Sequence, residues 1–208
     1  MKRAPASAPG ATLTYSNANY TVLGLLIEKL TGVTVQQAVA IRIIEPLGLT
    51  GTSFPASGDR SLPAPAVRGY HGVRIGGFFF WSNVVRYDPS AFSSSGAMIS
   101  TQQDLTAFFQ ALIGGRLISS ATLAEMEKAV EPGGPTAGLG YGLGLVRRDL
   151  PCGGVSWGRN GIVPGYFTQT LVTADGRHAS VVTNAHFTIN TPAEQMDKLL
   201  TTALCEKS

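Results

Sequence analysis

Apolar residues recur every three or four positions in several stretches of the chain, a spacing that is typical of amphipathic helices. In the first stretch, which begins at Asn17, they include Val22, Leu25 and Leu30, and the pattern stops at Thr31-Gly32. Capping residues, glycines and prolines bound further stretches of the same kind. The chain is therefore predicted to form helices over 17–31, 35–44, 101–113, 120–130 and 191–204, with the second stopping at Glu45-Pro46-Leu47-Gly48.

The region from about 141 to 184 has a different pattern, in which apolar positions alternate or run on without a break. Such segments are typical of strands, and four are predicted, over 141–148, 155–159, 166–173 and 178–184. Ala174-Asp175-Gly176-Arg177 holds the Asp-Gly pair that favours a tight hairpin turn. The order along the chain is therefore helices, a meander of antiparallel strands and a covering helix. This order predicts an α+β fold, with an antiparallel sheet covered by helices.

Residues 50–95 are rich in Gly, Pro and Ser and show little periodicity. They predict a long surface excursion, and loops of that length are usually functional or mobile. The aromatic run Phe78-Phe79-Phe80-Trp81 follows Gly76-Gly77. We expect these four side chains to be ordinary core, with a wall of a ligand site as the alternative.

The length of 208 residues predicts a single domain. Within it we expect a helical, loop-rich lobe over about 15–135, after a short entry segment over 4–14, and strands with the last helix over about 136–208. Only 14% of the residues are charged, against about 25% in average chains, and 44% are hydrophobic, which excludes a disordered chain.

The net charge of +3 is spread along the chain, so we expect no nucleic-acid partner. The longest uncharged apolar stretch lies near Val22–Ile27, far short of the roughly 20 residues that a membrane span needs. Met1-Lys2-Arg3 is not followed by an apolar segment, so no signal peptide is expected on this chain, which taken alone points to the cytoplasm.

Two cysteines, Cys152 and Cys205, leave two interpretations open. They are either free buried thiols or one disulfide that ties the last helix to a strand and implies an oxidising compartment. The three histidines, His71, His178 and His186, lack the spacing of metal ligands, and the chain holds neither a CxxC nor an HExxH motif. We therefore expect no metal site and no cofactor.

Tyr15-Ser16-Asn17, with Pro9-Gly10 before it, resembles a motif of the serine β-lactamase and DD-peptidase superfamily. The likeness is greatest to the secreted D-alanyl-D-alanine carboxypeptidases that are related to class C β-lactamases. Further stretches match in the same order: Tyr20-Thr21-Val22-Leu23-Gly24, Glu28-Lys29-Leu30-Thr31-Gly32, Glu45-Pro46-Leu47-Gly48-Leu49, Ser95-Gly96-Ala97-Met98-Ile99-Ser100 with Asp104-Leu105, and Tyr141-Gly142-Leu143-Gly144-Leu145.

The resemblance implies a transpeptidase-like fold, export from the cell, and a Cys152–Cys205 disulfide. It also implies acyl transfer to a serine and then to water, with peptidyl-D-Ala-D-Ala or a β-lactam-like small molecule as the partner. In this family Tyr15 would handle a proton as a catalytic residue, and Asn17 would orient the substrate. From the residues alone, Asn17 would instead cap the following helix while Tyr15 packs.

The third motif of the family aligns with Gly158-Arg159-Asn160-Gly161-Ile162. Arg159 stands where His or Lys is expected and would hold a substrate carboxylate by two parallel bonds. Asn160 replaces a hydroxyl residue, Gly161 matches, and Ile162 would offer its backbone N–H to an oxyanion. The alternative for Arg159 is an arginine that is merely solvated on a strand.

The Ser-x-x-Lys motif that supplies the family's nucleophile does not occur in these residues. None of the five lysines has a serine three positions before it: Lys2, Lys29, Lys128, Lys198 and Lys207. We interpret the chain as a partial β-lactamase-like domain, the C-terminal part of a serine hydrolase that is inactive alone. The alternative is a non-catalytic module for peptidoglycan stem peptides or a protein partner. A nucleophile at Ser94 or Ser95 is a weak third reading, and the oligomeric state is open.

Overall fold

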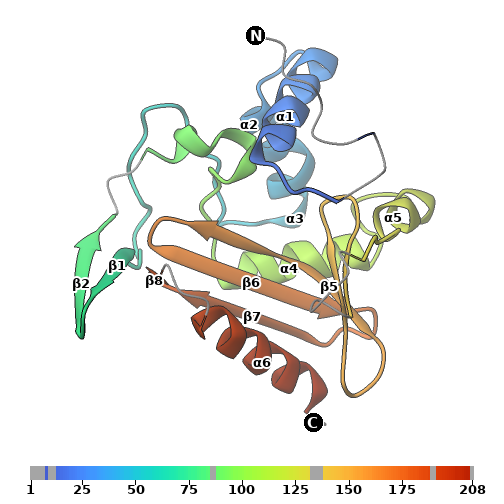
Figure 1. The fold of residues 1–208 in the computed structure, drawn as a ribbon. Coiled ribbons are helices and arrows are strands. Elements are labelled where there is room, and N and C mark those ends of the chain that lie inside the picture. Colours follow the sequence, from blue (N-terminus) through green and yellow to red (C-terminus); the bar gives the residue numbers. More distant parts are fainter. Residues whose placement is uncertain (1–7, 9–12, 85–87, 132–137, 188–190, 207–208) are drawn as a thin grey trace.

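The computed structural model describes residues 8, 13–84, 88–131, 138–187 and 191–206. Its centre is an antiparallel sheet in the order β3-β4-β5-β6-β7 (Figure 1). The strands of this sheet are β3 Leu139–Tyr141, β4 Val146–Asp149, β5 Val155–Val163, β6 Tyr166–Thr173 and β7 His178–Thr183. The helices are α1 Asn17–Thr31, α2 Val35–Val39, α3 Glu45–Leu47, α4 Gln102–Ile113, α5 Ser120–Met126 and α6 Thr191–Cys205. The predicted α+β class is confirmed.

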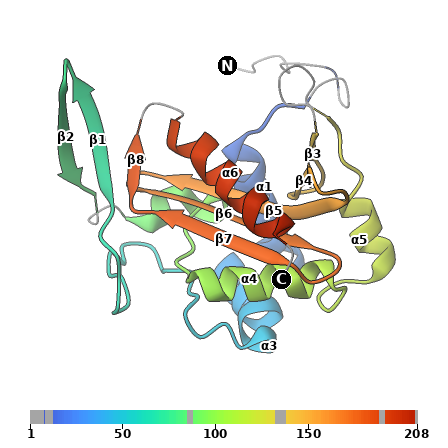
Figure 2. The same cartoon turned by 90° about the horizontal axis from the view of Figure 1, so that it is seen from below.

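The core consists of two apolar clusters, one on each face of the sheet. On one face Phe109 and Leu112 of α4 pack against Leu145, Trp157 and Val172. The second cluster joins α6 to the opposite face and contains Leu150, Leu171, Leu200 and Leu204. Since neighbouring residues of a strand point to opposite faces, Leu171 and Val172 of β6 contribute to different clusters. The sheet is therefore a middle layer between α4 and α6 (Figure 2).

Local signals set the helix boundaries. Ser16 caps α1 by accepting a hydrogen bond from the N–H of Ala18, and Gly32 ends it in a left-handed conformation. The second helix continues past its predicted end at Ile44, because a π-helical turn over Ala40–Ile44 leads from α2 into α3, but it still stops within the predicted segment Glu45-Pro46-Leu47-Gly48. Pro46 lies in the first turn of α3, where its missing N–H costs little, and the helix ends at Gly48.

The helix α4 is tied to the loop that follows α3. Thr101 caps α4, and the buried carboxylate of Asp104 accepts hydrogen bonds from the N–H of Gly51 at 2.9 Å and the hydroxyl of Thr52 at 2.7 Å. The lobe is thus fastened to the helix that covers the sheet.

Three boundaries in the second half differ from the prediction. The segment 141–148 is two strands, β3 and β4, because Gly144 adopts a positive φ of 79° and turns the chain between them. The strand predicted over 155–159 continues to Val163 and ends where Gly165 adopts a φ of 83°. The helix α5 ends at Met126 rather than at residue 130. The hairpin turn at Asp175-Gly176 lies between β6 and β7 as predicted.

Residues 50–95 contain regular structure that the sequence analysis missed. They form β1 Tyr70–Ile75, β2 Phe78–Asn83 and a 3-10 helix over Pro89–Ser95. A second sheet in the order β2-β1-β8 includes β8 Ala185–Phe187, which runs parallel to β1. The expectation that the aromatic run is core is wrong, because all six residues of β2 are exposed. Most of the predicted entry segment 4–14 and the boundary near residue 135 lie outside the described residues.

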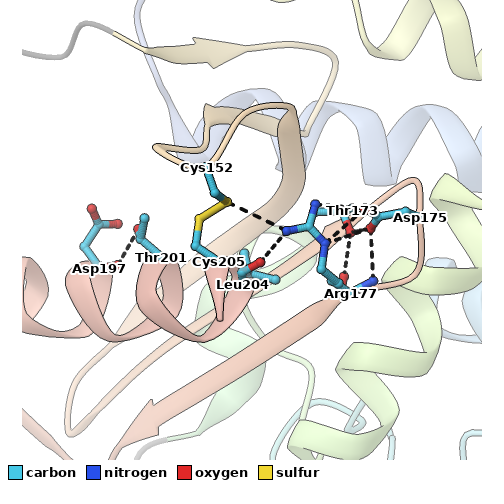
Figure 3. Close-up of a disulfide and its surroundings, with 8 residues drawn as sticks. All are labelled: Cys152, Thr173, Asp175, Arg177, Asp197, Thr201, Leu204 and Cys205. Atoms are coloured by element: carbon cyan, nitrogen blue, oxygen red, sulfur yellow. Dashed lines mark hydrogen bonds and ion pairs between the residues drawn. A yellow bond between two sulfur atoms is a disulfide. The ribbon is translucent and has the colours of Figure 1, made fainter. Parts of the chain in front are cut away.

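A disulfide joins Cys152 to Cys205, with an S–S distance of 2.07 Å, and so links the turn after β4 to the end of α6 (Figure 3). The two cysteines are 53 residues apart, and closing a loop of that size restricts the unfolded chain by about 4 kcal/mol. Arg177 reinforces the same corner, since its guanidinium donates to the carbonyl of Leu204 and pairs with Asp175. A cation at the C-terminal end of a helix also interacts favourably with the negative end of the helix dipole.

No described helix is long and apolar enough to cross a membrane by itself. The pair formed by α1 and the stretch Val35–Leu47 meets the criteria of length and composition together, with a bend of 81° between its two parts.

Leu143 and Leu145 allow a matched test of the α4 cluster, because they are two residues apart and 65% and 1% exposed. Leu145→Ala is expected to lower the free energy of unfolding by about 2–5 kcal/mol, because it leaves a cavity under α4. Leu143→Ala is the control and is expected to change it by less than about 0.5 kcal/mol. Urea unfolding followed by circular dichroism measures both. Equal losses in the two variants would contradict this packing.

Candidate functional site

The predicted site residues at the start of α1 are joined to each other. The hydroxyl of Tyr15 donates a hydrogen bond to Oδ1 of Asn17 at 2.8 Å. Asn17 is the first residue of α1, but Ser16 supplies the N-cap, so the side chain of Asn17 is not used for capping. The structural alternative in which Asn17 caps the helix is therefore wrong. Tyr15 is 50% exposed, so the pair is open to solvent.

Arg159 of β5 lies against this pair. The central carbon of its guanidinium is 5.0 Å from the ring centre of Tyr15 and 4.9 Å from that of Tyr141. Both distances are within the range of cation–π attraction, which is worth about 0.5–2 kcal/mol per contact. One arginine thus connects the start of α1, β3 and β5. The alternative, in which Arg159 is merely solvated on its strand, does not agree with this packing.

The charge of Arg159 has no carboxylate partner in the described part of the chain. The ion pairs of the other strand arginines, such as Arg147 with Asp149 and Arg148 with Asp197, lie elsewhere in the sheet. Aromatic faces stabilise a cation without neutralising it. The guanidinium is therefore placed to take an anion, and a carboxylate is the group that its forked donors fit.

Tyr20 and Tyr141 complete the cluster, although the sequence analysis did not assign either to the site. Their hydroxyl oxygens are 2.9 Å apart, and the ring centre of Tyr15 is 5.8 Å from Tyr20 and 6.5 Å from Tyr141. Burial and the hydrogen bond to Tyr20 raise the pKa of Tyr141 well above its ordinary value, and the charge of Arg159 opposes this only in part. Tyr141 is therefore held as a neutral phenol that can donate or accept a hydrogen bond.

The rest of the third motif lies along the outer edge of β5. The pairing of β4 with β5 covers only Val155–Gly158, so from Arg159 onward no described strand lies on that edge. Gly161 is packed closely, because a Cβ there would come within 2.9 Å of the Thr168 hydroxyl. Ile162 is exposed and pairs with Phe167 across β6. Its role as a backbone donor stays a prediction.

Asn160 is separated from the cluster by the geometry of the strand. Side chains alternate between the faces of a strand, so Asn160 points away from the face that carries Trp157 and Arg159. It is paired with Gln169 on β6. The structure thus brings together Tyr15, Asn17 and Arg159, and places the side chain of Asn160 on the other face.

The serines considered as alternative nucleophiles have packing roles. The hydroxyl of Ser95 donates to the carbonyl of Phe92 within the 3-10 helix. Ser94 lies against α1 at Gly24, where a Cβ would come within 2.0 Å of its hydroxyl oxygen. In the described part of the chain no hydrogen bond connects either serine to a basic side chain. The cluster therefore offers an anion-binding cation, a phenol–amide pair and an open strand edge, but no activated serine among the residues described.

Comparison with known families identifies the chain. The family model described as Beta-lactamase matches residues 1–202. A Salmonella heidelberg (strain SL476) protein named "Putative D-alanyl-D-alanine carboxypeptidase" is 26% identical over 200 residues, which cover 84% of this chain and 45% of the relative. A Bacillus subtilis (strain 168) protein named "Putative penicillin-binding protein PbpX" is 29% identical over 154 residues, or 73% of this chain and 34% of the relative.

Solved structures give the same fold. A D-stereospecific amidohydrolase from Streptomyces sp. superposes with a TM-score of 0.81 at 36% identity and covers 88% of this chain and 53% of its own. A D-amino acid amidase from Ochrobactrum anthropi SV3 superposes with a TM-score of 0.79 at 22% identity, over 95% of this chain and 58% of its own. The chain spans less than half the length of the curated relatives it matches and somewhat more than half of these structures.

The raised pKa of Tyr141 predicts that its phenol ionises at a higher pH than an ordinary tyrosine in an alkaline titration. Unfolded tyrosine loses its proton near pH about 10, whereas Tyr141 keeps its proton to higher pH in the folded state. Below a pH of about 10 this group does not make the free energy of unfolding depend on pH. Above it the free energy of unfolding falls as the pH rises, because only the unfolded state ionises. Ultraviolet absorbance of phenolate in the native chain and in Tyr141→Phe measures the late phase.

Tyr166 provides the matched control, because burial also raises its pKa and its hydroxyl donates to the carbonyl of Val67 at the far end of the sheet. Tyr166→Phe and Tyr141→Phe are each expected to remove one tyrosine from the phase that ionises at high pH. A late phase that Tyr141→Phe leaves unchanged would contradict the assignment.

Proposed function

The chain belongs to the Beta-lactamase family, and we propose that it forms the substrate-binding part of a serine hydrolase acting on peptides or amides with a D-configured residue. The observation that carries the proposal is the guanidinium of Arg159, held between Tyr15 and Tyr141 and without a carboxylate partner in the described residues. The names of the relatives, a D-alanyl-D-alanine carboxypeptidase among them, support the substrate class.

In the proposed complex the substrate lies along the open edge of β5. Arg159 binds its terminal carboxylate by two parallel charge-assisted hydrogen bonds. The backbone N–H of Ile162 stabilises the oxygen that becomes negative when the acyl carbon is attacked. The hydroxyl of Tyr15, which donates to Asn17 in this structure, gives its proton to the leaving amine and takes the proton of the attacking hydroxyl, so it is a neutral phenol before and after the step, while Asn17 orients the substrate amide.

In this proposal the nucleophile is supplied by a segment that is not among the 208 residues. No Ser-x-x-Lys occurs in the sequence, and α1 presents an exposed apolar face beside the site. Leu30 is 76% exposed, and Val22, Leu25 and Leu26 are exposed as well. Contiguous exposed apolar surface of this kind marks an interaction site. We propose that a segment bearing the Ser-x-x-Lys motif packs on this face and completes the active site.

A second candidate function is a non-catalytic module that binds peptidoglycan stem peptides. Two departures from the family motif favour it, namely Arg159 in place of His or Lys and Asn160 in place of a hydroxyl residue. Arg159 preserves the charge that holds a carboxylate, whereas the side chain of Asn160 lies on the face away from Tyr15. Such a module would keep affinity for the peptide without turnover.

We also propose that the protein works outside the cytoplasm. The Cys152–Cys205 disulfide supports this placement, because disulfides form and persist in oxidising compartments. The peptidoglycan stem peptides of the proposed substrate class are found on the same side of the membrane.

The hydrolase proposal predicts that the 208 residues alone do not form an acyl-enzyme. Incubation with a penicillin followed by intact-protein mass spectrometry is expected to show the unmodified mass, since no serine is activated. Adding a peptide that carries a Ser-x-x-Lys helix is expected to produce the adduct on that peptide. A covalent adduct on a serine of the 208-residue chain itself would contradict this division of the site.

Binding of an N-acyl-D-alanyl-D-alanine dipeptide tests the role of Arg159. Arg159→Ala is expected to raise the Kd by about 10- to 100-fold, because both charge-assisted hydrogen bonds to the carboxylate are lost. Arg159→Lys is expected to give an intermediate Kd, since the charge remains without the fork. Arg147→Ala, an arginine on the neighbouring strand, is the control and keeps the native Kd.

Isothermal titration calorimetry measures these affinities, and circular dichroism confirms that each variant is folded. Absence of binding to the native chain at millimolar peptide, or equal affinity in Arg159→Ala, would overturn the proposed carboxylate site.

A further inference from the structure

The hairpin formed by β1 and β2, which we call the aromatic hairpin (residues 70–83), stands at the edge of the molecule. Figures 1 and 2 show it beside the body of the fold, with its tip directed away from the central sheet. The tip is the turn at Gly76-Gly77, where Gly76 adopts a φ of 62°. Antiparallel pairing of β1 with β2 continues without a break from the tip to Tyr70 and Asn83.

One face of the aromatic hairpin is apolar throughout its outer half. Cross-strand partners lie on the same face, so Ile75 with Phe78 and Val73 with Phe80 form one surface. Phe78 is 75% exposed and Ile75 64%, and the other two are also exposed. Four neighbouring apolar side chains in water are a feature that calls for a partner.

The opposite face carries a pair of stacked rings. Phe79 and Trp81 have ring centres 6.4 Å apart at an interplanar angle of 22°. The ring of Trp81 lies over Gly72, where a Cβ would come within 2.8 Å of it. Glycine at this position therefore allows an indole to lie flat on the hairpin while remaining 47% exposed.

The base of the hairpin is held firmly to the body. The hydroxyl of Tyr166 donates to the carbonyl of Val67 at 2.6 Å, and its ring lies against Gly69. The N–H of Tyr70 donates to the carbonyl of Asn184 at 2.8 Å, and β1 pairs with β8. The apolar face is thus presented in a fixed direction, so that little conformational entropy is lost when it binds.

The charge around the hairpin is positive on balance. Residues 59–88 contain four arginines and two aspartates, Asp59 and Asp88, which is a net charge of +2, against +3 for the whole chain. Of these arginines, Arg60 and Arg68 are described and exposed, and Arg60 lies close enough to the Asp88 carboxylate to interact with it. The hairpin thus has an exposed apolar tip, an indole near its middle and an exposed arginine, Arg68, at its base. This order matches the layers of an anionic lipid surface.

We propose that the aromatic hairpin is a docking element for an anionic membrane surface. Val73, Ile75, Phe78 and Phe80 enter the boundary between headgroups and acyl chains, Trp81 lies at headgroup level, and Arg68 contacts a lipid phosphate. Apolar area buried in the interface and attraction to anionic lipid together determine the strength of such binding. The site formed by Arg159 lies on the central sheet, so docking leaves it open.

Sedimentation with vesicles tests the proposal on the 208-residue chain. Binding is expected to vesicles of phosphatidylglycerol and phosphatidylethanolamine, to weaken at high salt, and to be much weaker with phosphatidylcholine alone. The double variant Phe78→Ser/Phe80→Ser is expected to lower the partition coefficient by about tenfold or more. Arg68→Glu, which leaves the apolar face intact, is expected to lower it only with the anionic vesicles.

Fluorescence locates the contact, because the chain has two tryptophans and Trp157 is buried in the core. Anionic vesicles are expected to shift the emission of Trp81 to shorter wavelength, and Trp81→Phe removes the shift while keeping binding. Leu143→Ser and Leu30→Ser, at exposed leucines outside the hairpin, are the controls and keep native binding. Vesicle binding needs no substrate, so its outcome is independent of the acyl-transfer proposal.

Three results would overturn the proposal. The first is absence of binding to anionic vesicles. The second is binding that Leu30→Ser abolishes while Phe78→Ser/Phe80→Ser keeps it, which assigns the membrane contact to α1. The third is a lipid-free oligomer that the hairpin double variant dissociates, which identifies the face as an interface between copies of the chain. Thermal unfolding of each variant confirms that its fold is native.

Discussion

Trp157 and Val172 are cross-strand partners on one face of the β5–β6 pair, whereas Gly158 and Leu171 are partners on the other. This alternation requires that both faces be covered, by α4 and by α6. The two strands also lie close together at this point, because a Cβ at Gly158 would come within 1.8 Å of the carbonyl oxygen of Thr170. The register of one strand pair thus fixes the two helices, and with them the position of Arg159 one residue further along β5.

The site depends on that register in a second way. Arg159 is on the face of β5 that also carries Trp157, and there its guanidinium meets rings from α1 and from β3. Two tyrosines from segments that are 126 residues apart, at 15 and 141, therefore share one cation. A change in any of the three elements would alter the distance between the phenol of Tyr15 and the charge that faces it.

The elements with strong periodicity and clear stops were predicted correctly from sequence. The pattern that begins at Asn17 and the Asp-Gly turn at 175 gave α1 and the β6–β7 hairpin at nearly their observed bounds. The aromatic hairpin was missed because Phe78-Phe79-Phe80-Trp81 is apolar on both faces, which removes the alternation that marks a strand. Tyr15 and Arg159 were found through the family resemblance. The contact of Tyr20 with Tyr141 spans 121 residues, and only the folded chain brings them together.

The Cys152–Cys205 bond encloses β5, β6, β7, β8 and α6 within one covalent ring. A protease that cuts a single peptide bond anywhere inside this ring leaves two fragments that remain linked through sulfur. The sheet half of the site, with Arg159, therefore stays attached to the lobe half, with Tyr15, after such a cut. Wherever a protease meets the folded chain, the disulfide preserves the connection between the two halves even when the backbone between them is broken.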